Sequence, residues 1–194
     1  MSDQSENLEP AVPENLDPAV PKHLDPAVPE NVEPTTAETI PFSVPSEYSS
    51  ALERVLALAT EEILIFDRDL QQGDWGSLER AERLRSFLLS HRRTRIQIVV
   101  HETLHIERHL ARIVRLLRDF SHKMSVLRTI DDGRNAWDGF VLVDHRHLVH
   151  RFHLDSTRGE LSIDHPQKVR ELRERFDELL VHTEPGLSAT PFGL

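Results

Sequence analysis

Three groups of side chains in this 194-residue chain could do chemistry, and the first is a literal His-Glu-x-x-His pattern. It runs from His101 through Glu102 to His105. In zinc peptidases with this pattern, both histidines lie on one helix face and bind the metal, while the glutamate acts as general base. Here His101 directly follows the apolar run Ile96–Val100, which predicts a buried strand. We therefore interpret the match as accidental, and a zinc-dependent hydrolase using these three residues is the alternative.

The second group is a set of histidines on a predicted hairpin, namely His145, His147, His150 and His153. Side chains alternate between the two faces of a strand, so only His147 and His153 could share a ligand set. At roughly 3.3 Å per residue, these two histidines lie about 20 Å apart. A metal site formed by this strand alone is therefore excluded, and the cluster predicts a half-exposed face. We expect no metal and no cofactor.

The third group is a row of arginines on one predicted helix, at Arg108, Arg112, Arg115 and Arg118. They lie on the face opposite the apolar stripe of that helix, which is typical of a solvated surface. Three further arginines, Arg92, Arg93 and Arg95, precede a predicted strand. Because arginine forks match phosphate oxygens, Arg108, Arg112 and Arg115 are candidate phosphate ligands. A phosphate- or nucleic-acid-binding module that uses the Arg108–Arg118 row is a second alternative function.

The first quarter of the chain differs in composition from the rest. Residues 1–45 hold nine acidic residues and one lysine, a net charge of −8, whereas residues 46–194 are close to neutral at −2. Residues 7–34 repeat with a period of eight, and nine of the twelve prolines precede residue 46. Prolines interrupt helices and sheets, and the repeat has too few apolar side chains to offset the entropy of ordering. We predict a disordered, extended, acidic and proline-rich tail over 1–45, followed by a folded domain over 46–194.

Composition also limits the class of protein. Cysteine is absent, so disulfides and thiolate metal sites are impossible. No run approaches the roughly 18 apolar residues of a membrane-spanning helix. The first residues are acidic and lack the basic start and apolar core of a secretion signal. We expect a cytoplasmic protein that does not associate with membranes.

The elements that must position these groups follow from the spacing of apolar residues. Helices are predicted over 47–60 with Ser46 as the cap, from Ser77, over 106–120, and from Pro166. Strands are predicted over 63–66, 96–100 and 124–127, followed by a hairpin over 137–153, whereas the residues from Glu184 are expected to be irregular. This alternation predicts an α/β sandwich, in which helices cover both faces of a mixed sheet. The run Phe140–Val143 is apolar on both faces, so we expect it at the centre of the sheet.

The order of these elements and the strand that ends in Asp144 resemble one half of the phospholipase D superfamily. In that family the strand carries H-x-K-x-x-x-x-D. The histidine attacks phosphorus and the lysine neutralises the phosphoryl oxygens. Aligned on Asp144, the pattern places Trp137 at the position of the nucleophile and Gly139 at the position of the lysine. The family's downstream Gly-Ser-x-Asn is also absent, because His150-Arg151-Phe152 occupies its place. The resemblance implies a three-layer fold in which Trp137, Gly139 and Asp144 mark a degenerate motif and no catalytic residue remains.

Within the superfamily, residues 46–194 are most similar to uncharacterised bacterial proteins with a phospholipase-D-like domain, some of which carry it beside an N-acetyltransferase domain. The similarity rests on the order of Ile65–Asp67, Leu117–His122, Trp137–Asp144, Phe176–Leu180 and Glu184-Pro185. An indole cannot form a phosphorus–nitrogen bond and a glycine supplies no cation, so covalent phosphodiester cleavage is unsupported. We expect a binding or interaction module. Catalytic relatives need two motif copies, often from two subunits, so the resemblance also implies a homodimer through the old active-site face. Its partner would otherwise be a protein or a phosphate-containing ligand.

Overall fold

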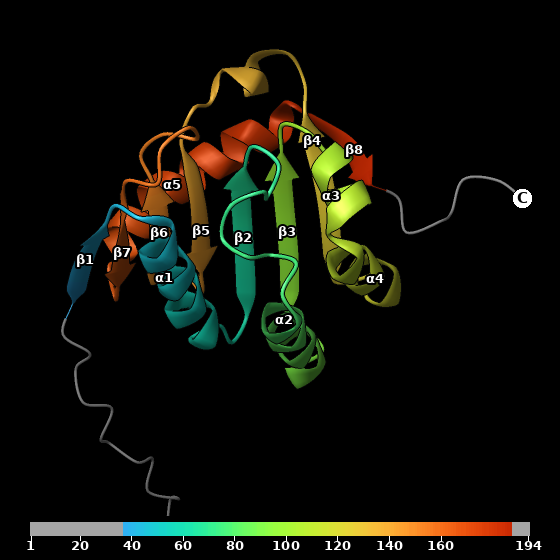
Figure 1. The fold of residues 1–194 in the computed structure, drawn as a ribbon, viewed down its shortest axis with the longest axis horizontal. Helices are drawn as coiled ribbons and strands as arrows, with labels where there is room; N and C mark the ends of the chain where they lie inside the picture. Colours follow the sequence, from blue (N-terminus) through green and yellow to red (C-terminus); the bar gives the residue numbers. More distant parts are fainter. Residues whose placement is uncertain (1–36, 188–194) are drawn as a thin grey trace, which may run out of the picture. The chain divides into compact units, whose positions relative to one another are not determined.

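The apolar runs of the chain pair into one mixed sheet of eight strands, in the order β1-β7-β6-β5-β2-β3-β4-β8 (Figure 1). The structure is a computed structural model, and it describes residues 37–187. Its strands are β1 (Glu38–Phe42), β2 (Glu62–Asp67), β3 (Arg95–Val100), β4 (Met124–Thr129), β5 (Gly139–Val143), β6 (His147–Arg151), β7 (Gly159–Ile163) and β8 (Thr183–Leu187). β2, β3 and β4 run parallel, and every other neighbouring pair is antiparallel.

Helices cover both faces of this sheet, as the sequence predicted. They are α1 (Pro45–Ala57), α2 (Leu78–Ser90), α3 (Leu104–His109), α4 (Ala111–Asp119) and α5 (Pro166–Val181), with a short 3₁₀ helix η1 (Asp131–Asn135) before β5. Figure 1 shows α1 to α4 in front of the sheet and α5 behind it. Each face has its own apolar cluster: Val141 and Val143 of β5 belong to the front one, and Phe140 and Leu142 pack with Phe176 of α5. The predicted α/β sandwich is confirmed, and β5 is a central strand.

The beginning of the described region differs from the prediction. We expected residues 37–45 to belong to the tail, but β1 pairs with β7, with Ile40 opposite Leu161. Phe42 is buried and its ring packs 5.5 Å from that of Tyr48. An edge strand tolerates Pro41 because one side of its backbone needs no partner. The tail prediction is therefore wrong for this stretch. The eight-residue repeat and the rest of residues 1–36 lie outside the described residues.

Two further elements differ from the prediction. The single helix predicted over 106–120 is interrupted at Leu110, whose backbone (φ −108°, ψ 51°) separates α3 from α4. Glu184 to Gly186, expected to be irregular, lie in β8, which pairs antiparallel with β4. Gly186 allows this pairing because a Cβ there would lie only 3.0 Å from the backbone of Leu127. Both differences arise from packing that apolar spacing alone does not encode.

Local capping also differs at α1 and agrees at α2. Ser46 does not cap α1; instead Glu47 Oε2 accepts from the backbone N–H groups of Ser43 (2.8 Å) and Val44 (3.3 Å). Ser77, where the second helix was predicted to begin, is the cap of α2, since its hydroxyl oxygen accepts from Arg80 N at 3.2 Å. None of the helices described between residues 37 and 187 combines the length and apolar character that crossing a bilayer requires.

Candidate functional site

Three parallel strands end at one edge of the sheet, and the motif positions expected from the resemblance begin there. β2, β3 and β4 point to this edge, and β5 starts at it because β5 is antiparallel to β2. Ligands of open α/β sheets bind outside the carboxyl ends of such strands. Asp67 ends β2, His101 follows β3, and Trp137 and Gly139 lie just before and at the start of β5. We call this the carboxyl edge.

At the carboxyl edge, the space beside Gly139 is filled by Arg151 of the neighbouring strand. The two residues are direct partners in the β5–β6 register. A Cβ on Gly139 would lie 3.2 Å from Arg151 Nη2, so a longer side chain would have to displace the guanidinium. The Arg151 side chain passes across β5 and donates from Nη2 to Asp67 Oδ2 of β2 at 2.6 Å. The position expected for a lysine is therefore occupied by a cation that comes from another strand.

The charge of Arg151 is paired inside the protein, although its buried Nε has no hydrogen-bond partner. Its Nη1 donates to Gln72 Oε1 at 2.7 Å, and its guanidinium carbon lies 5.0 Å from the centre of the Tyr48 ring. Arg151 is 1% exposed and Asp67 is 3% exposed, so no solvent screens the pair. Burial raises the pKa of Asp67, and the attraction of Arg151 opposes that shift. Burial and the nearby Asp67 also raise the pKa of Tyr48. This group can hold strands together, but it cannot offer a cation to a ligand.

Trp137, at the position of the family's nucleophile, lies outside the strand predicted over 137–144. β5 begins two residues later, at Gly139. The indole is 56% exposed and stacks on the ring of His153, with centroids 6.0 Å apart and planes inclined by 16°. Phe152, next in the chain to His153, is 55% exposed. The carboxyl edge therefore presents two large aromatic side chains to solvent.

The third motif position, Asp144, has a structural role at the other end of β5. Its backbone adopts a positive φ of 50° in the β5–β6 turn. Oδ1 accepts from the backbone N–H groups of Glu61 (2.8 Å) and Glu62 (2.7 Å), and Oδ2 accepts from the Thr60 N–H and hydroxyl. All four contacts fasten the turn to the start of β2. Asp144 is thus far from Trp137, at the opposite end of the sheet.

The His-Glu-x-x-His residues do not meet on one helix face. His101 follows β3 and is 8% exposed. Its Nδ1 lies 2.7 Å from Thr129 Oγ1, and its Nε2 lies 2.8 Å from the Ala136 carbonyl oxygen, which only accepts. Both ring nitrogens are engaged, while His105 lies in α3 and stacks on His109. Between residues 37 and 187, no group of three or more His, Asp or Glu side chains could hold a metal ion.

The four hairpin histidines separate as strand alternation requires, and each has a different neighbour. His150 Nε2 lies 3.0 Å from Oδ2 of the buried Asp138, on the α5 face. His147 Nδ1 accepts from the backbone N–H of Asp164 at 3.0 Å, and burial lowers the pKa of His147. His145 lies beside Glu62 at the turn, and His153 lies beyond the end of β6. They do not form a common site.

The arginine row is likewise divided. Arg108 belongs to α3, whereas the other three lie on α4, beyond the break at Leu110. Arg112 donates to the Gly76 carbonyl oxygen at 2.9 Å, and Arg115 lies 3.9 Å from Asp119 in the same helix. Two members are thus engaged in contacts within the protein. The structure does not assemble the row into one phosphate cradle.

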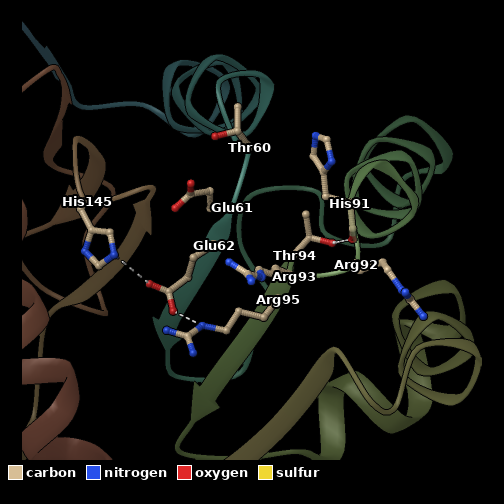
Figure 2. Close-up of a pocket in the computed structure, with 9 residues that line it drawn as sticks. All are labelled: Thr60, Glu61, Glu62, His91, Arg92, Arg93, Thr94, Arg95 and His145. Carbon is tan, nitrogen blue, oxygen red and sulfur yellow. Dashed lines mark hydrogen bonds and ion pairs between the residues drawn. The ribbon is translucent and has the colours of Figure 1, made fainter.

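The other arginine group lies at the opposite edge, where β2 and β3 begin (Figure 2). A hollow of about 550 Å³ opens there between the loop before β2, the loop before β3 and the β5–β6 turn. Its lining consists of Thr60, Glu61, Glu62, His91, Arg92, Arg93, Thr94, Arg95 and His145. We call it the amino-edge hollow.

Sequence reasoning missed the most constrained residues of the carboxyl edge, which are Arg151, Asp67 and Gln72. The available signal was the hairpin register. A turn at 144–146 places Gly139 opposite Arg151, and a glycine opposite a long cation suggests that the cation crosses it. The destination on β2 could not be predicted, because it depends on which strand lies next to β5.

Comparison with known proteins agrees with this architecture. A family model described as "Domain of unknown function (DUF7931)" matches residues 45–185. No curated protein matches the chain. Among solved structures, the chain is similar to Nuc from Salmonella typhimurium, a phospholipase D family member, with 11% identity and a TM-score of 0.56. It is also similar to NucT from Helicobacter pylori, with 13% identity and a TM-score of 0.53. In each case 78% of this chain and 99% of the other are covered.

A third similar structure is longer. TrmBL2, described as an archaeal chromatin protein with a novel mode of DNA binding, shares 13% identity at a TM-score of 0.53. The match covers 76% of this chain but 53% of TrmBL2, so the chain spans about half of that protein. At such identities the similarity concerns the fold alone. The fold is phospholipase-D-like.

Removing the buried cation tests its role at the carboxyl edge. Arg151→Met leaves Asp67 buried without its partner, so the free energy of unfolding should fall by about 3–5 kcal/mol. The double variant Asp67→Asn with Arg151→Met should lose less than Arg151→Met alone, because no unpaired charge remains. Urea denaturation measures both values. Arg68→Met, which breaks only the exposed contact with Asp155, is the control and should cost much less. Equal losses in the single and double variants would show that the pair is not coupled.

The buried His101 predicts an acid-sensitive fold. Burial lowers the pKa of His101 below its usual value of 6.5. The unfolded chain therefore binds this proton more readily, and stability is complete above pH 6.5 but declines as pH falls below it. We expect the native chain to lose stability between pH 7 and pH 5, and His101→Asn to lose less over that interval. Thermal unfolding at the two pH values measures this, and parallel losses would contradict it.

Proposed function

The chain belongs to the family described as a domain of unknown function (DUF7931), and we propose that it is a non-catalytic phospholipase-D-like domain that acts as an interaction module. One observation carries the proposal. The cation beside Gly139 is Arg151, which is already ion-paired with Asp67. A phosphoryl-transfer site needs an uncompensated cation and a nucleophile near it. The motif positions supply neither, since Trp137 stands at the nucleophile position and Arg151 is already paired.

The alternatives are weaker on geometric grounds. A zinc hydrolase needs His101 as a ligand, yet both of its ring nitrogens already have partners. A nucleic-acid binder using the Arg108–Arg118 row needs a continuous cationic face, yet the helix is broken at Leu110. The similarity to TrmBL2 concerns the fold alone, so it identifies no residue of this chain that would contact a nucleic acid.

A second copy of the chain is the partner that the carboxyl edge supports best. Trp137 and Phe152 are both more than half exposed there; Trp137 stacks on His153, and Phe152 packs edge-on against His150. Aromatic side chains are enriched in the buried centres of protein interfaces. A twofold arrangement would place the same aromatic patch on both sides, so that each Trp137 packs against the edge of the other copy.

Catalysis can be tested directly. The purified full chain should not hydrolyse bis(4-nitrophenyl) phosphate above the buffer rate, because no imidazole at the carboxyl edge is placed beside a free cation. The measurement is release of nitrophenolate. Turnover that disappears when one histidine is replaced, for example in His153→Asn, would overturn the proposal.

Self-association is the second test. The full chain should run as a dimer in size-exclusion chromatography with light scattering at micromolar concentration, and Trp137→Glu should convert it to a monomer. The matched control is Leu89→Glu, which places the same charge at a 61% exposed apolar position near the end of α2. That control should remain dimeric. A native chain that is monomeric, or a control that dissociates equally, would contradict the Trp137 interface.

A further inference from the structure

The amino-edge hollow is a built concavity of ligand size. Its volume of about 550 Å³ falls within the range of roughly 300–1,000 Å³ that is common for small-molecule sites. Three separate connections contribute to it: residues 60–62 before and at the start of β2, residues 91–95 before and at the start of β3, and His145 of the β5–β6 turn. It lies at the end of the sheet opposite Trp137, about 20 Å away along the strands.

Two of the three carboxylates beside this hollow, those of Glu62 and Asp144, are already engaged, whereas that of Glu61 has no hydrogen-bond or ion-pair partner among the described residues. Glu62 is 5% exposed, and its two oxygens accept from Arg95 Nε and Arg173 Nη1. Asp144 is saturated by its four contacts with residues 60–62. Figure 2 shows the Glu62 carboxylate between Arg95 and His145, at one side of the hollow. These two acids therefore have little capacity left to neutralise further cations.

The amino-edge hollow also contains arginine side chains whose charge is not paired. Neither Arg92 nor Arg93 forms an ion pair within residues 37–187, and Arg95 uses only Nε on Glu62, so its terminal nitrogens stay available. Figure 2 shows Arg93 directed toward Glu61 and Glu62 across the hollow, whereas Arg92 turns outward. The lining holds three arginines against two glutamates, in a domain whose net charge is negative. The hollow is locally positive.

The loop that carries these arginines is held firmly. The Thr94 hydroxyl, 2% exposed, lies within hydrogen-bond distance of the carbonyl oxygens of Leu88 (3.2 Å) and His91 (2.9 Å). Lys123 Nζ donates to the same two oxygens, at 2.7 Å and 2.6 Å. These are carbonyl groups at the end of α2, where the helix dipole would otherwise repel an anion. Because Lys123 and the Thr94 hydroxyl already bind these carbonyl oxygens, their repulsion of an anion is reduced. The same contacts hold the loop that carries the arginines in place before a ligand binds.

We propose that the amino-edge hollow binds a small phosphorylated ligand, with its phosphate oxygens held by Arg93 and the terminal nitrogens of Arg95. Guanidinium forks match the geometry of phosphate oxygens and can engage two at once. Arg92, at the outer rim, adds to the positive field that attracts the anion. The site is separate from the Trp137 face and does not depend on self-association there.

Calorimetric titration of the full chain with pyrophosphate tests this site. We expect saturable binding that weakens as salt is added, with ADP binding and adenosine, which lacks phosphate, not binding. Arg93→Ala should weaken pyrophosphate affinity about fivefold, as expected for one partly exposed charged contact.

The control is Arg158→Ala, which removes the same side chain from an exposed position just before β7, at the opposite end of the sheet. It should leave pyrophosphate affinity unchanged. Absence of saturable binding at millimolar pyrophosphate, equal effects of Arg93→Ala and Arg158→Ala, or adenosine binding as well as ADP would each overturn the proposal. Because Trp137→Glu should bind pyrophosphate as the native chain does, failure here is distinguishable from failure of the interface.

Discussion

The ion pair that Arg151 of β6 forms with Asp67 of β2, across Gly139 of β5, constrains the whole carboxyl edge. It links three adjacent strands where an active site would need open space. A buried pair of this kind contributes little net stability compared with apolar packing, but removing one partner is costly. The pair therefore restricts which residues can surround it. Position 139 of β5 requires a glycine-sized residue, and Gln72 must lie close enough to accept a hydrogen bond from Nη1 of Arg151.

The two ends of the sheet use their charges in opposite ways. At the carboxyl edge the central cation and carboxylate neutralise each other away from water, and aromatic rings are exposed around them. At the amino edge two acidic side chains form contacts within the protein: Asp144 accepts from backbone N–H groups, and Glu62 pairs with two arginines. Cations in excess of those acids remain near solvent. The location of uncompensated charge, more than the position of the motif that the resemblance suggested, indicates where an anion can bind.

Much of the architecture was predictable because β2, β3, β5 and α5 carry strong apolar patterns that burial on both faces requires. Of the strands that were not predicted, β1 and β8 are the two outermost strands of the sheet, and β7 lies next to β1. β1 and β8 contain Pro41 and Pro185, residues that predict irregular chain unless one knows that an edge strand tolerates them. The motif positions were found by pattern, yet Arg151 was not. Its role depends on the register of one hairpin and on the strand that lies beyond it.

If the domain is non-catalytic, as we propose, the contacts beside Gly139 explain how the fold persists without a reaction. A catalytic cation must be held uncompensated near solvent, an arrangement that costs stability because its field is unmatched. Here the guanidinium is paired with Asp67 and lies over the Tyr48 ring, so the position that the resemblance assigned to a lysine belongs to the buried interior. Once that space is filled, recognition can lie only on surfaces outside it. The exposed ring of Trp137 and the arginines of the amino-edge hollow are two such surfaces.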